Sequence, residues 1–331
     1  MEYRKIGNSE LELSAITFGA FAIGGWLWGG TKLKESIDAI HAAYESGITS
    51  FDTAPVYGQG TSEKLVGEAI KGIPRDKIQI LTKYGLRWDT KQGQFYTHSV
   101  NNDGENIDLY FFAGKKGIIE ECENSLRRLG TDYIDLYQIH WPDPSTPIEE
   151  TMEAIQQLIK EGKVRYAGVC NYSAELMKKA SSCISLVSNQ VPFSMVNRGI
   201  EKKLVPYMLK SQQSVIAYSP MQRGLLTGKI KPGQKFGAGD QRSSMPFYAE
   251  ENLKRTNNFL EKIKPLAKKK NATLAQLVLR WTIEQPAITI ALAGARNAEQ
   301  ATQNAKAADI KLSKEDISFI NKELDKLKLD I

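Results

Sequence analysis

Short runs of apolar residues alternate along the chain with segments in which apolar residues recur every three or four positions. The first pattern predicts strands that are buried on both faces, and the second predicts helices with one apolar stripe. The predicted strands lie at residues 16–18, 49–53, 78–83, 133–140, 164–169, 186–190, 215–218 and 287–292. The predicted helices lie at residues 33–47, 62–71, 116–129, 174–181, 200–211, 250–270, 274–284, 298–307 and 314–328, with another that opens in a capping box at Thr146-Pro147.

Strands that alternate with helices form parallel sheets through right-handed crossovers. A doubly wound open sheet and a closed barrel both satisfy this order. The count of eight strands favours the barrel, and no internal repeat or linker divides the chain. We therefore predict an α/β fold with a single (β/α)8 TIM barrel, and one domain over residues 1–331. Residues 84–114 and 221–248 are long segments without a predicted helix or strand.

The composition narrows the function classes that such a fold could carry. Hydrophobic residues make up 41% and charged residues 25% of the 331, as in ordinary globular proteins. The net charge of +6 is spread along the chain without a recognition motif, so we expect no nucleic-acid partner. Cys122, Cys170 and Cys183 form no C-x-x-C pair, and we expect neither a metal site nor a disulfide framework. This cysteine usage favours a reducing compartment, so a cytoplasmic location is expected.

Residues 13–31 carry no charge and are long enough to suggest a membrane span. Glycines interrupt this stretch, and acidic residues precede it, which a signal peptide does not tolerate. A buried strand that runs into a glycine-rich loop fits the stretch better, so we expect no membrane association.

Four polar residues stand at or just after the ends of three consecutive predicted strands. They are Asp52 and Tyr57, Lys83, and His140. Each could be structural by itself, but the C-terminal strand ends of a barrel share one rim, where catalytic residues gather. An ammonium group lowers the pKa of a neighbouring Tyr phenol, a carboxylate holds that ammonium, and a His orients a carbonyl. The set predicts a proton donor for reduction of a carbonyl group.

The motifs around these residues are specific. They read DTAPVYG at residues 52–58, LTK at 81–83, LRRLGTDYIDLYQIH at 126–140, GKVRYAGV at 162–169 and GLLTGK at 224–229. With these motifs the chain resembles the aldo-keto reductase family over nearly its whole length. Within that family it is similar to bacterial general-stress and sugar-associated reductases, which are related to potassium-channel β subunits. The resemblance implies the barrel with an N-terminal β-hairpin and extra C-terminal helices.

The resemblance also implies roles for the four residues. Tyr57 would be the general acid and base, Lys83 and Asp52 would tune it, and His140 would position the carbonyl. A nicotinamide cofactor would lie across the barrel mouth without a Rossmann fold, in agreement with the absence of a G-x-G-x-x-G motif after any predicted strand.

The resemblance assigns the cofactor site to three parts of the chain. Asn171, Gln190 and Tyr218 match the positions that hold the nicotinamide, and Cys170 stands where the family usually has Ser. The pyrophosphate would lie on the segment after residue 218, which includes Ser219, Pro220, Met221, Arg223, Gly224 and Leu225. Lys229 and Arg242 would add positive charge. The adenosine end would meet Gly294, Arg296, Gln300 and Asn304. A guanidinium at Arg296 suits a 2′-phosphate and favours NADPH, whereas Glu299 keeps NADH open.

Four tryptophans are candidates for the substrate pocket, namely Trp26, Trp28, Trp88 and Trp141. Residues 84–114 would form a flexible wall, and their polar side chains favour a sugar or another polyhydroxylated carbonyl compound: Arg87, Asp89, His98, Asn101, Asn102 and Asp103. We expect an NADPH-dependent carbonyl reductase that is a monomer or a weak homo-oligomer. The alternatives are a sugar dehydrogenase that works in the oxidative direction and a cofactor-sensing regulatory subunit.

Overall fold

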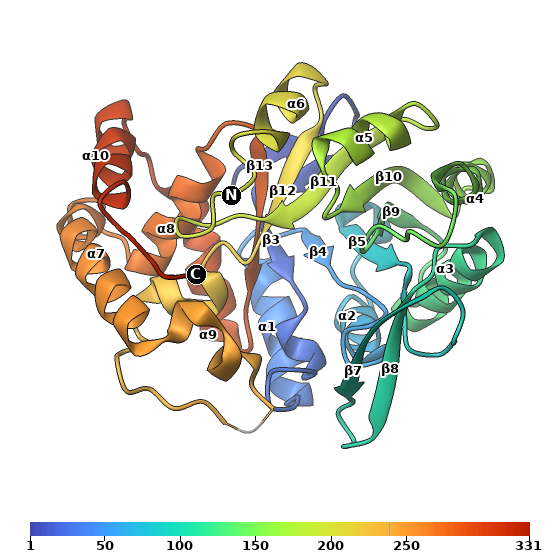
Figure 1. Cartoon of the computed structure of the whole chain (residues 1–331), viewed down its shortest axis with the longest axis horizontal. Helices are drawn as coiled ribbons and strands as arrows, with labels where there is room; N and C mark the ends of the chain where they lie inside the picture. The colour runs from blue at the N-terminus through green and yellow to red at the C-terminus, as the bar shows by residue number, and fades with distance from the viewer. Residues whose placement is uncertain (238) are drawn as a thin grey trace.

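The structure, a computed structural model, describes residues 1–237 and 239–331. In this part of the chain eight parallel strands close into a barrel, in the spatial order β10-β11-β12-β13-β3-β4-β5-β9 (Figure 1). Their bounds are β3 (Ile16–Gly19), β4 (Ser50–Asp52), β5 (Gln79–Tyr84), β9 (Ile134–Ile139), β10 (Val164–Cys170), β11 (Leu186–Pro192), β12 (Ser214–Tyr218) and β13 (Ile288–Gly294). The predicted barrel is confirmed, and each predicted strand agrees with the observed one to within two residues at either end.

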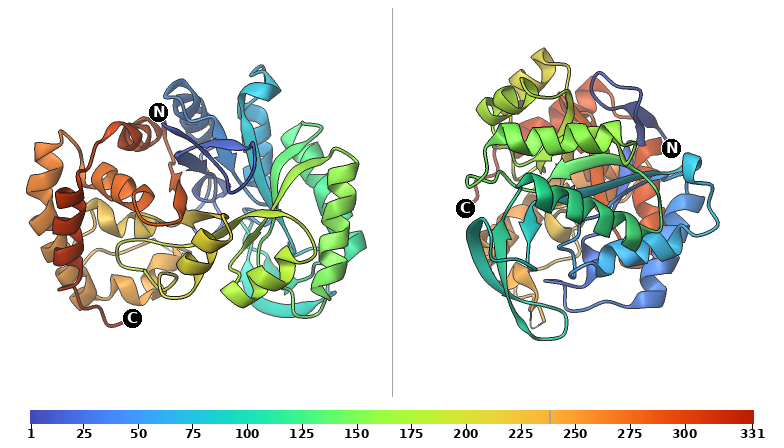
Figure 2. Two further views of the ribbon diagram at one scale, coloured as in Figure 1. Left: turned by 90° about the horizontal axis from the view of Figure 1, so that it is seen from above. Right: turned by 90° about the vertical axis from the view of Figure 1, so that its right-hand side faces the viewer.

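Helices surround the strands on the outside (Figures 1 and 2). They are α1 (Leu33–Glu45), α2 (Thr61–Ala69), α3 (Lys115–Leu129), α4 (Ile148–Lys160), α5 (Ala174–Ser181), α6 (Leu204–Lys210), α7 (Glu250–Lys269), α8 (Leu274–Ile283), α9 (Ala298–Ala305) and α10 (Lys314–Leu324). The helix predicted at 200–211 is shorter, since α6 begins only at Leu204. The capping box predicted at Thr146-Pro147 does not form, because α4 follows Pro147 and has no side-chain cap.

The N-terminal hairpin closes one end of the barrel. Strands β1 (Tyr3–Lys5) and β2 (Glu12–Ser14) pair antiparallel, as the resemblance implied. Ile6, Leu11 and Leu13 are buried against inward-facing residues of the barrel strands, such as Leu81 and Ile216. Burial of this apolar surface stabilises the fold and leaves only the other end, where the strands terminate, open for chemistry.

Residues 84–114 differ from the flexible wall that we expected. They form a three-stranded antiparallel sheet of β6 (Leu86–Arg87), β8 (Asn106–Phe111) and β7 (Gln94–Val100), and β7 and β8 project from the body of the molecule (Figure 2). Most side chains of β7 are exposed, so it lacks the buried apolar run by which the barrel strands were predicted.

The uncharged stretch at residues 13–31 contains β3 and the short 3₁₀ helix η1 (Ala22–Gly24). It is therefore a buried strand followed by a glycine-containing loop, as predicted. In the described part of the chain no helix combines the length and the apolar character that crossing a membrane requires.

A glycine allows α2, the helix that follows Tyr57, to approach α3 closely. A Cβ atom on Gly67 would lie 2.6 Å from the carbonyl oxygen of Arg128 and 2.8 Å from that of Leu129. These are backbone atoms, so a side chain at this position can be accommodated only if the two helices separate.

We expect the Gly67→Ala substitution to lower the free energy of unfolding by about 1–3 kcal/mol, the usual cost of overpacking. Urea unfolding followed by tryptophan fluorescence measures it. The matched control is Gly199→Ala, because a Cβ on Gly199 meets no atom within 4 Å and its φ is not left-handed. The control should stay within about 0.5 kcal/mol of the parent protein. Equal losses in both variants would contradict the packing argument.

Candidate active site

The four predicted residues meet at the open end of the barrel. Asp52 ends β4, Lys83 lies near the end of β5, and His140 follows β9 directly. Tyr57 lies in the loop between β4 and α2. Strand β5 pairs with both β4 and β9, so this order of neighbours brings three distant parts of the sequence to one point of the rim.

A buried ion pair forms the base of the site. The Nζ atom of Lys83 lies 2.6 Å from Oδ1 of Asp52 and donates a second hydrogen bond of 2.8 Å to the carbonyl oxygen of Thr53. The exposed fractions of the two side chains are 0% and 3%. Nε2 of Gln190 donates a hydrogen bond of 2.8 Å to the other carboxylate oxygen of Asp52. The carboxylate is therefore held from both sides, and it fixes the ammonium in turn.

Tyr57 lies beside this pair, partly buried at the mouth of the barrel. The Nζ atom of Lys83 is 5.1 Å from the centre of the Tyr57 ring. The His140 ring packs edge-on against the Tyr57 ring, with 5.6 Å between the ring centres and an angle of 78°. Phe21 completes the enclosure at 4.7 Å between ring centres. The phenol thus has one cationic and one imidazole neighbour, as the strand-end positions predicted.

The pKa of Tyr57 is raised overall, although the neighbouring ammonium was expected to lower it. Burial raises this pKa to about 12 and outweighs the ammonium of Lys83. Burial acts to lower the pKa of Lys83, but the charges of Asp52, Tyr57 and Cys170 and the hydrogen bond to Asp52 together outweigh it, so the net shift is upward. Burial, together with Lys83, holds the pKa of His140 well below its usual range. Tyr57 is therefore a protonated phenol, Lys83 an ammonium and His140 a neutral imidazole at physiological pH.

The residues expected to hold the nicotinamide lie next to these four. Asn171 has a left-handed backbone, with φ of 61°. Its Nδ2 donates a hydrogen bond of 3.0 Å to the carbonyl oxygen of His140, and its Oδ1 accepts one of 3.0 Å from the Tyr218 hydroxyl. Gln190, assigned to the same group, donates to Asp52 instead, so it links this part of the site to the ion pair.

Cys170 is 1% exposed, and burial raises the pKa of its thiol. A buried protonated thiol is inert, so the structure gives this residue a packing position rather than a reactive one.

The segment after β12 has an unusual backbone. Ser219, Gln222, Arg223 and Gly224 have φ values of 53°, 45°, 51° and 96°. Left-handed residues in such a turn can aim several amide groups at one point, as an anion-binding nest requires. Leu225 is fully buried, so only its backbone can reach a ligand there. Pro220 is also buried and Met221 partly so, which places both in the support of the turn.

Three of the cationic residues assigned to the cofactor site differ in their surroundings. Arg242 is paired with Asp240 at 2.6 Å and lies over the ring of Trp28, 5.3 Å from its centre. Arg296 donates to the carbonyl oxygens of Trp28 and Gly30, both at 3.3 Å. Lys229 is exposed and has no ion-pair partner among the described residues. Arg242, through its contact with Trp28, and Arg296, through its hydrogen bonds to Trp28 and Gly30, both hold the loop after β3 in place.

Gln300 and Asn304 lie one turn apart on α9, as their spacing predicted. Oε1 of Gln300 accepts a hydrogen bond of 2.9 Å from the backbone N–H of Arg296. Nδ2 of Asn304 donates one of 3.1 Å to the carbonyl oxygen of Gly294. Both amides therefore brace the turn that presents Arg296.

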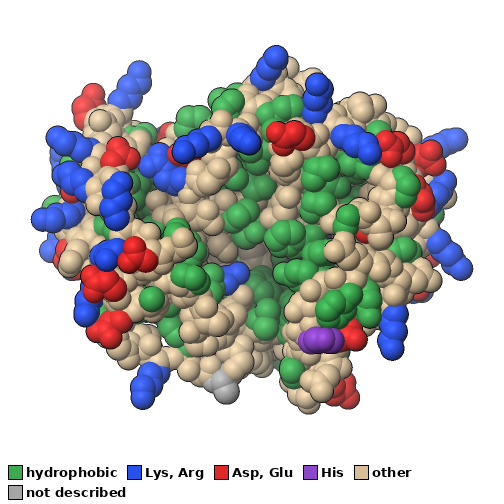
Figure 3. Space-filling model, viewed as in Figure 1, with side chains coloured by type: hydrophobic (Ala, Val, Ile, Leu, Met, Phe, Trp, Pro, Cys, Tyr) green, Lys and Arg blue, Asp and Glu red, His purple; other side chains and the backbone are tan. Residues whose placement is uncertain are grey.

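Trp26, Trp88, Trp141 and Tyr57 belong to one hydrophobic cluster at the barrel mouth. Trp28 lies beside it and packs edge-on against the cluster member Phe21, with 6.0 Å between ring centres. Trp26 is 7% exposed, and its Nε1 donates to Oγ of Ser99 at 3.2 Å. The other three tryptophans are partly buried. Sequence reasoning missed further aromatic members of this wall: Phe21, Tyr96 and Phe111. Figure 3 shows this face of the molecule hollowed near its centre, with hydrophobic side chains around the hollow.

The polar side chains of residues 84–114 do not make the pocket polar. Arg87 pairs with Asp89 at 2.6 Å, and His98 pairs with Asp108 at 2.7 Å. Asn101 and Asn102 donate to Glu105 and to the carbonyl oxygen of Gly24. Asp103 is exposed at the hairpin tip. Most of these groups are engaged by neighbouring side chains or by the backbone of Gly24, so they do not by themselves indicate a sugar as the substrate.

The comparisons with known proteins agree with the fold and with the motifs. The model of the Aldo/keto reductase family matches residues 15–325. The aldo-keto reductase YhdN of Bacillus subtilis is 39% identical over 323 residues, which cover 97% of this chain and 93% of that protein. The NADH-specific methylglyoxal reductase of Escherichia coli is 34% identical over 320 residues, which cover 95% and 96%.

Solved structures give the same result. The glycerol dehydrogenase of Gluconobacter oxydans has a TM-score of 0.87 and 34% identity, over 98% of this chain and 95% of that chain. The chain belongs to the aldo/keto reductase family, as its motifs indicated. It is therefore an oxidoreductase that acts on carbonyl substrates and uses a nicotinamide cofactor.

Proposed function

We propose that this protein reduces a carbonyl compound to an alcohol with NADPH, and that Tyr57 is the proton donor. The observation that carries the proposal is the proximity of the Tyr57 ring to both the buried Lys83 ammonium and the neutral ring of His140. A protonated phenol that has a fixed cation on one side can release its proton to an oxygen that is becoming negative, because the cation stabilises the phenolate.

The remaining roles follow from the charges. His140 is neutral, so one ring nitrogen carries a proton and can donate a hydrogen bond to the substrate oxygen without adding a charge to the site. Lys83 stabilises the phenolate that forms when Tyr57 gives up its proton. Asp52 keeps the ammonium in place. In the oxidative direction the same phenolate accepts a proton from the alcohol.

The residues of the barrel mouth fit a nicotinamide dinucleotide. When bound, the reduced cofactor supplies the hydride. Asn171 and Gln190 offer carboxamide groups, and Tyr218 offers a ring, beside the four residues described above. Cationic side chains follow β12 and β13 and suit phosphate groups: Arg223, Lys229, Arg242 and Arg296. Arg296 supports NADPH, although one relative is named as NADH-specific.

We propose small oxygenated carbonyl compounds as substrates. The names of two relatives support this class, since one acts on methylglyoxal and the other on glycerol. The aromatic wall around Tyr57 packs against carbon and leaves the hydrogen bonding to Tyr57 and His140. The glycerol dehydrogenase also favours the alternative that this chain oxidises polyols or sugars. The complete set of four residues argues for an enzyme over a purely cofactor-sensing subunit.

We further propose that residues 1–331 form one catalytic domain that works as a monomer or a weak homo-oligomer. The closed barrel and the family match over residues 15–325 support one domain. The cysteines at positions 122, 170 and 183 are unpaired, which supports a reducing location such as the cytoplasm.

The Tyr57→Phe substitution tests the proton donor. It keeps the ring and removes the hydroxyl, so kcat for carbonyl reduction should fall about 100- to 10,000-fold. Cofactor binding, followed by tryptophan fluorescence, should be retained. The control is Tyr44→Phe, since Tyr44 lies on the outer helix α1 and its hydroxyl has no hydrogen bond among the described residues. If Tyr57→Phe keeps most of the parent activity while folded, Tyr57 is not the donor.

The pKa shifts predict a flat pH profile. Reduction requires the protonated phenol, and a pKa raised to about 12 keeps Tyr57 protonated throughout the physiological range. A lowered pKa keeps His140 neutral down to acid pH. The kcat for reduction should therefore show no inflection near either ordinary value, about 6.5 for His or about 10 for Tyr.

One other group titrates in this range and needs its own control. Burial raises the pKa of Glu121 to about 8, and its carboxylate accepts the backbone N–H of Gly85, two residues after Lys83. The Glu121→Gln variant removes this titration and keeps an acceptor. An inflection near pH 6.5 that persists in this variant would contradict a neutral His140.

Substitution of Arg296 tests whether the protein prefers NADPH over NADH. A guanidinium that contacts a 2′-phosphate contributes about 1.5–3 kcal/mol, so Arg296→Gln should raise the Kd of NADPH about 10- to 100-fold. The Kd of NADH should change less than about threefold, because that cofactor lacks the phosphate. Arg255→Gln on the outer helix α7 is the control. Equal weakening of both cofactors would show that Arg296 acts only by holding Trp28 and Gly30.

A further inference from the structure

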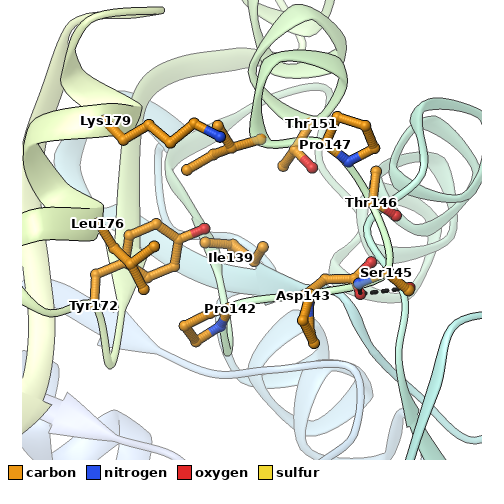
Figure 4. Close-up of a pocket in the computed structure, with 12 residues that line it drawn as sticks. Ile139, Pro142, Asp143, Ser145, Thr146, Pro147, Thr151, Tyr172, Leu176 and Lys179 are labelled. Atoms are coloured by element: carbon orange, nitrogen blue, oxygen red, sulfur yellow. Dashed lines mark hydrogen bonds between the residues drawn. The ribbon is translucent and has the colours of Figure 1, made fainter.

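A cavity of about 480 Å³ lies outside the active site, next to the C-terminal end of β9 (Figure 4). It is open to solvent on one side and is bordered by the loop from β9 to α4, by the first turn of α4, by α5 and by Tyr172, two residues before α5. The volume is within the range of roughly 300–1,000 Å³ that small-molecule sites occupy. The candidate catalytic residues Asp52, Tyr57, Lys83 and His140 do not line this cavity.

Much of the cavity wall is apolar and rigid. Pro142, Pro144 and Pro147 come from the one loop, and Ile148 and Leu176 come from the starts of α4 and α5. Proline rings have few conformations, so such a wall can bind a flat apolar group with little loss of side-chain entropy. The prolines favour a ring over a flexible chain as the occupant.

Tyr172 supplies an unused donor inside this wall. The residue is 4% exposed, and its hydroxyl makes no hydrogen bond among the described residues. Figure 4 shows the ring and its hydroxyl pointing into the cavity, near Ile139. Burial, and after it the charge of Asp143, raises the pKa of Tyr172, so the hydroxyl stays protonated and can donate. The hydroxyl thus has no acceptor among the described residues and is available to donate to an oxygen of a ligand.

Lys179 supplies a cation to the same space. Its ammonium group points over the cavity in Figure 4 and pairs with Glu149 at 3.3 Å. Both side chains of this pair are more than half exposed, at 55% and 56%, so the pair is weak and the ammonium can turn to another anion. The first turn of α4, which also borders the cavity, begins after Pro147 without a side-chain cap. Its backbone N–H groups favour negative charge, and Glu149 and Glu150 of the same turn already supply part of it.

The other charged group in the wall is already satisfied. One carboxylate oxygen of Asp143 accepts the backbone N–H of Ala113 at 2.7 Å. The other accepts the backbone N–H and the hydroxyl of Ser145, at 2.8 and 2.6 Å. Asp143 therefore shapes the loop and offers no free site to a cation. Tyr172, Lys179 and the hydroxyl of Thr146, which makes no hydrogen bond with the described residues, remain available to an incoming ligand, and all three can donate.

We propose that this cavity binds a small monocyclic aromatic carboxylate. The ring would lie among the prolines, and the carboxylate would accept hydrogen bonds from the Tyr172 hydroxyl and the Lys179 ammonium. The cavity shares two chain segments with the active site, since Ile139 precedes His140 and Tyr172 follows Asn171. Those two neighbours are joined by the hydrogen bond of 3.0 Å from Asn171 to the His140 carbonyl oxygen.

Titration calorimetry with benzoate tests the proposal and needs no assay of catalysis. We expect saturable binding of one benzoate per chain, with Kd raised at least about fivefold in Tyr172→Phe and also in Lys179→Met, because a charge-assisted hydrogen bond is lost in each. The matched control Lys178→Met changes the exposed neighbour of Lys179 on the same helix and should leave Kd unchanged. Benzyl alcohol, the uncharged analogue, should bind more weakly than benzoate.

The variants also separate this site from the aromatic mouth of the barrel. Benzoate bound at the mouth would keep its affinity in both variants, and that result overturns the proposal. No binding to the parent protein, or a loss in only one variant, overturns it too. Lys179 is at the surface, so the Lys179→Met arm stays informative even if Tyr172→Phe lowers stability. Failure of benzoate binding would leave the proposed reductase function untouched, since that is tested by turnover.

Discussion

The ion pair between Lys83 and Asp52 is the interaction on which the active end of the barrel depends. Two opposite charges are almost completely removed from water, at a desolvation cost that only close contact and further hydrogen bonds can offset. The carbonyl oxygen of Thr53 and the amide of Gln190 supply those hydrogen bonds. Strand β5 can bring Lys83 to Asp52 because it pairs directly with β4. The closed barrel thus fixes the pair, and the pair fixes the charge beneath Tyr57.

The proposed chemistry uses this fixed charge in a site that is otherwise apolar. Tyr57, enclosed by aromatic rings, stays protonated because burial outweighs the ammonium. The same ammonium helps to keep His140 neutral, so a single cation serves a phenol donor and an imidazole donor. Around them, Arg242 and Arg296 fasten the loop that carries Trp28. The mouth of the barrel is therefore braced by contacts between loops that follow different strands.

Much of this arrangement could be predicted from the sequence. The barrel strands are runs of buried residues, and their order implied that Asp52, Lys83 and His140 share a rim. The strands at residues 84–114 were missed, because most of β7 is exposed and carries no buried run. The upward pKa shift of Tyr57 was not predicted, since the sequence shows the neighbouring ammonium, which acts to lower that pKa, but not the depth of burial. The hydrogen bond from Gln190 to Asp52 joins residues 138 positions apart and leaves no local pattern.

A double-mutant cycle on Asp52 and Lys83 tests the central claim most directly. The measured quantity is kcat/KM for carbonyl reduction by Asp52→Asn, by Lys83→Met and by the variant that carries both changes. If Asp52 acts only through the ammonium, the double variant should lose no more activity than Lys83→Met alone. Losses that multiply would show that the two residues act independently, and would contradict an account in which the pair works as one unit.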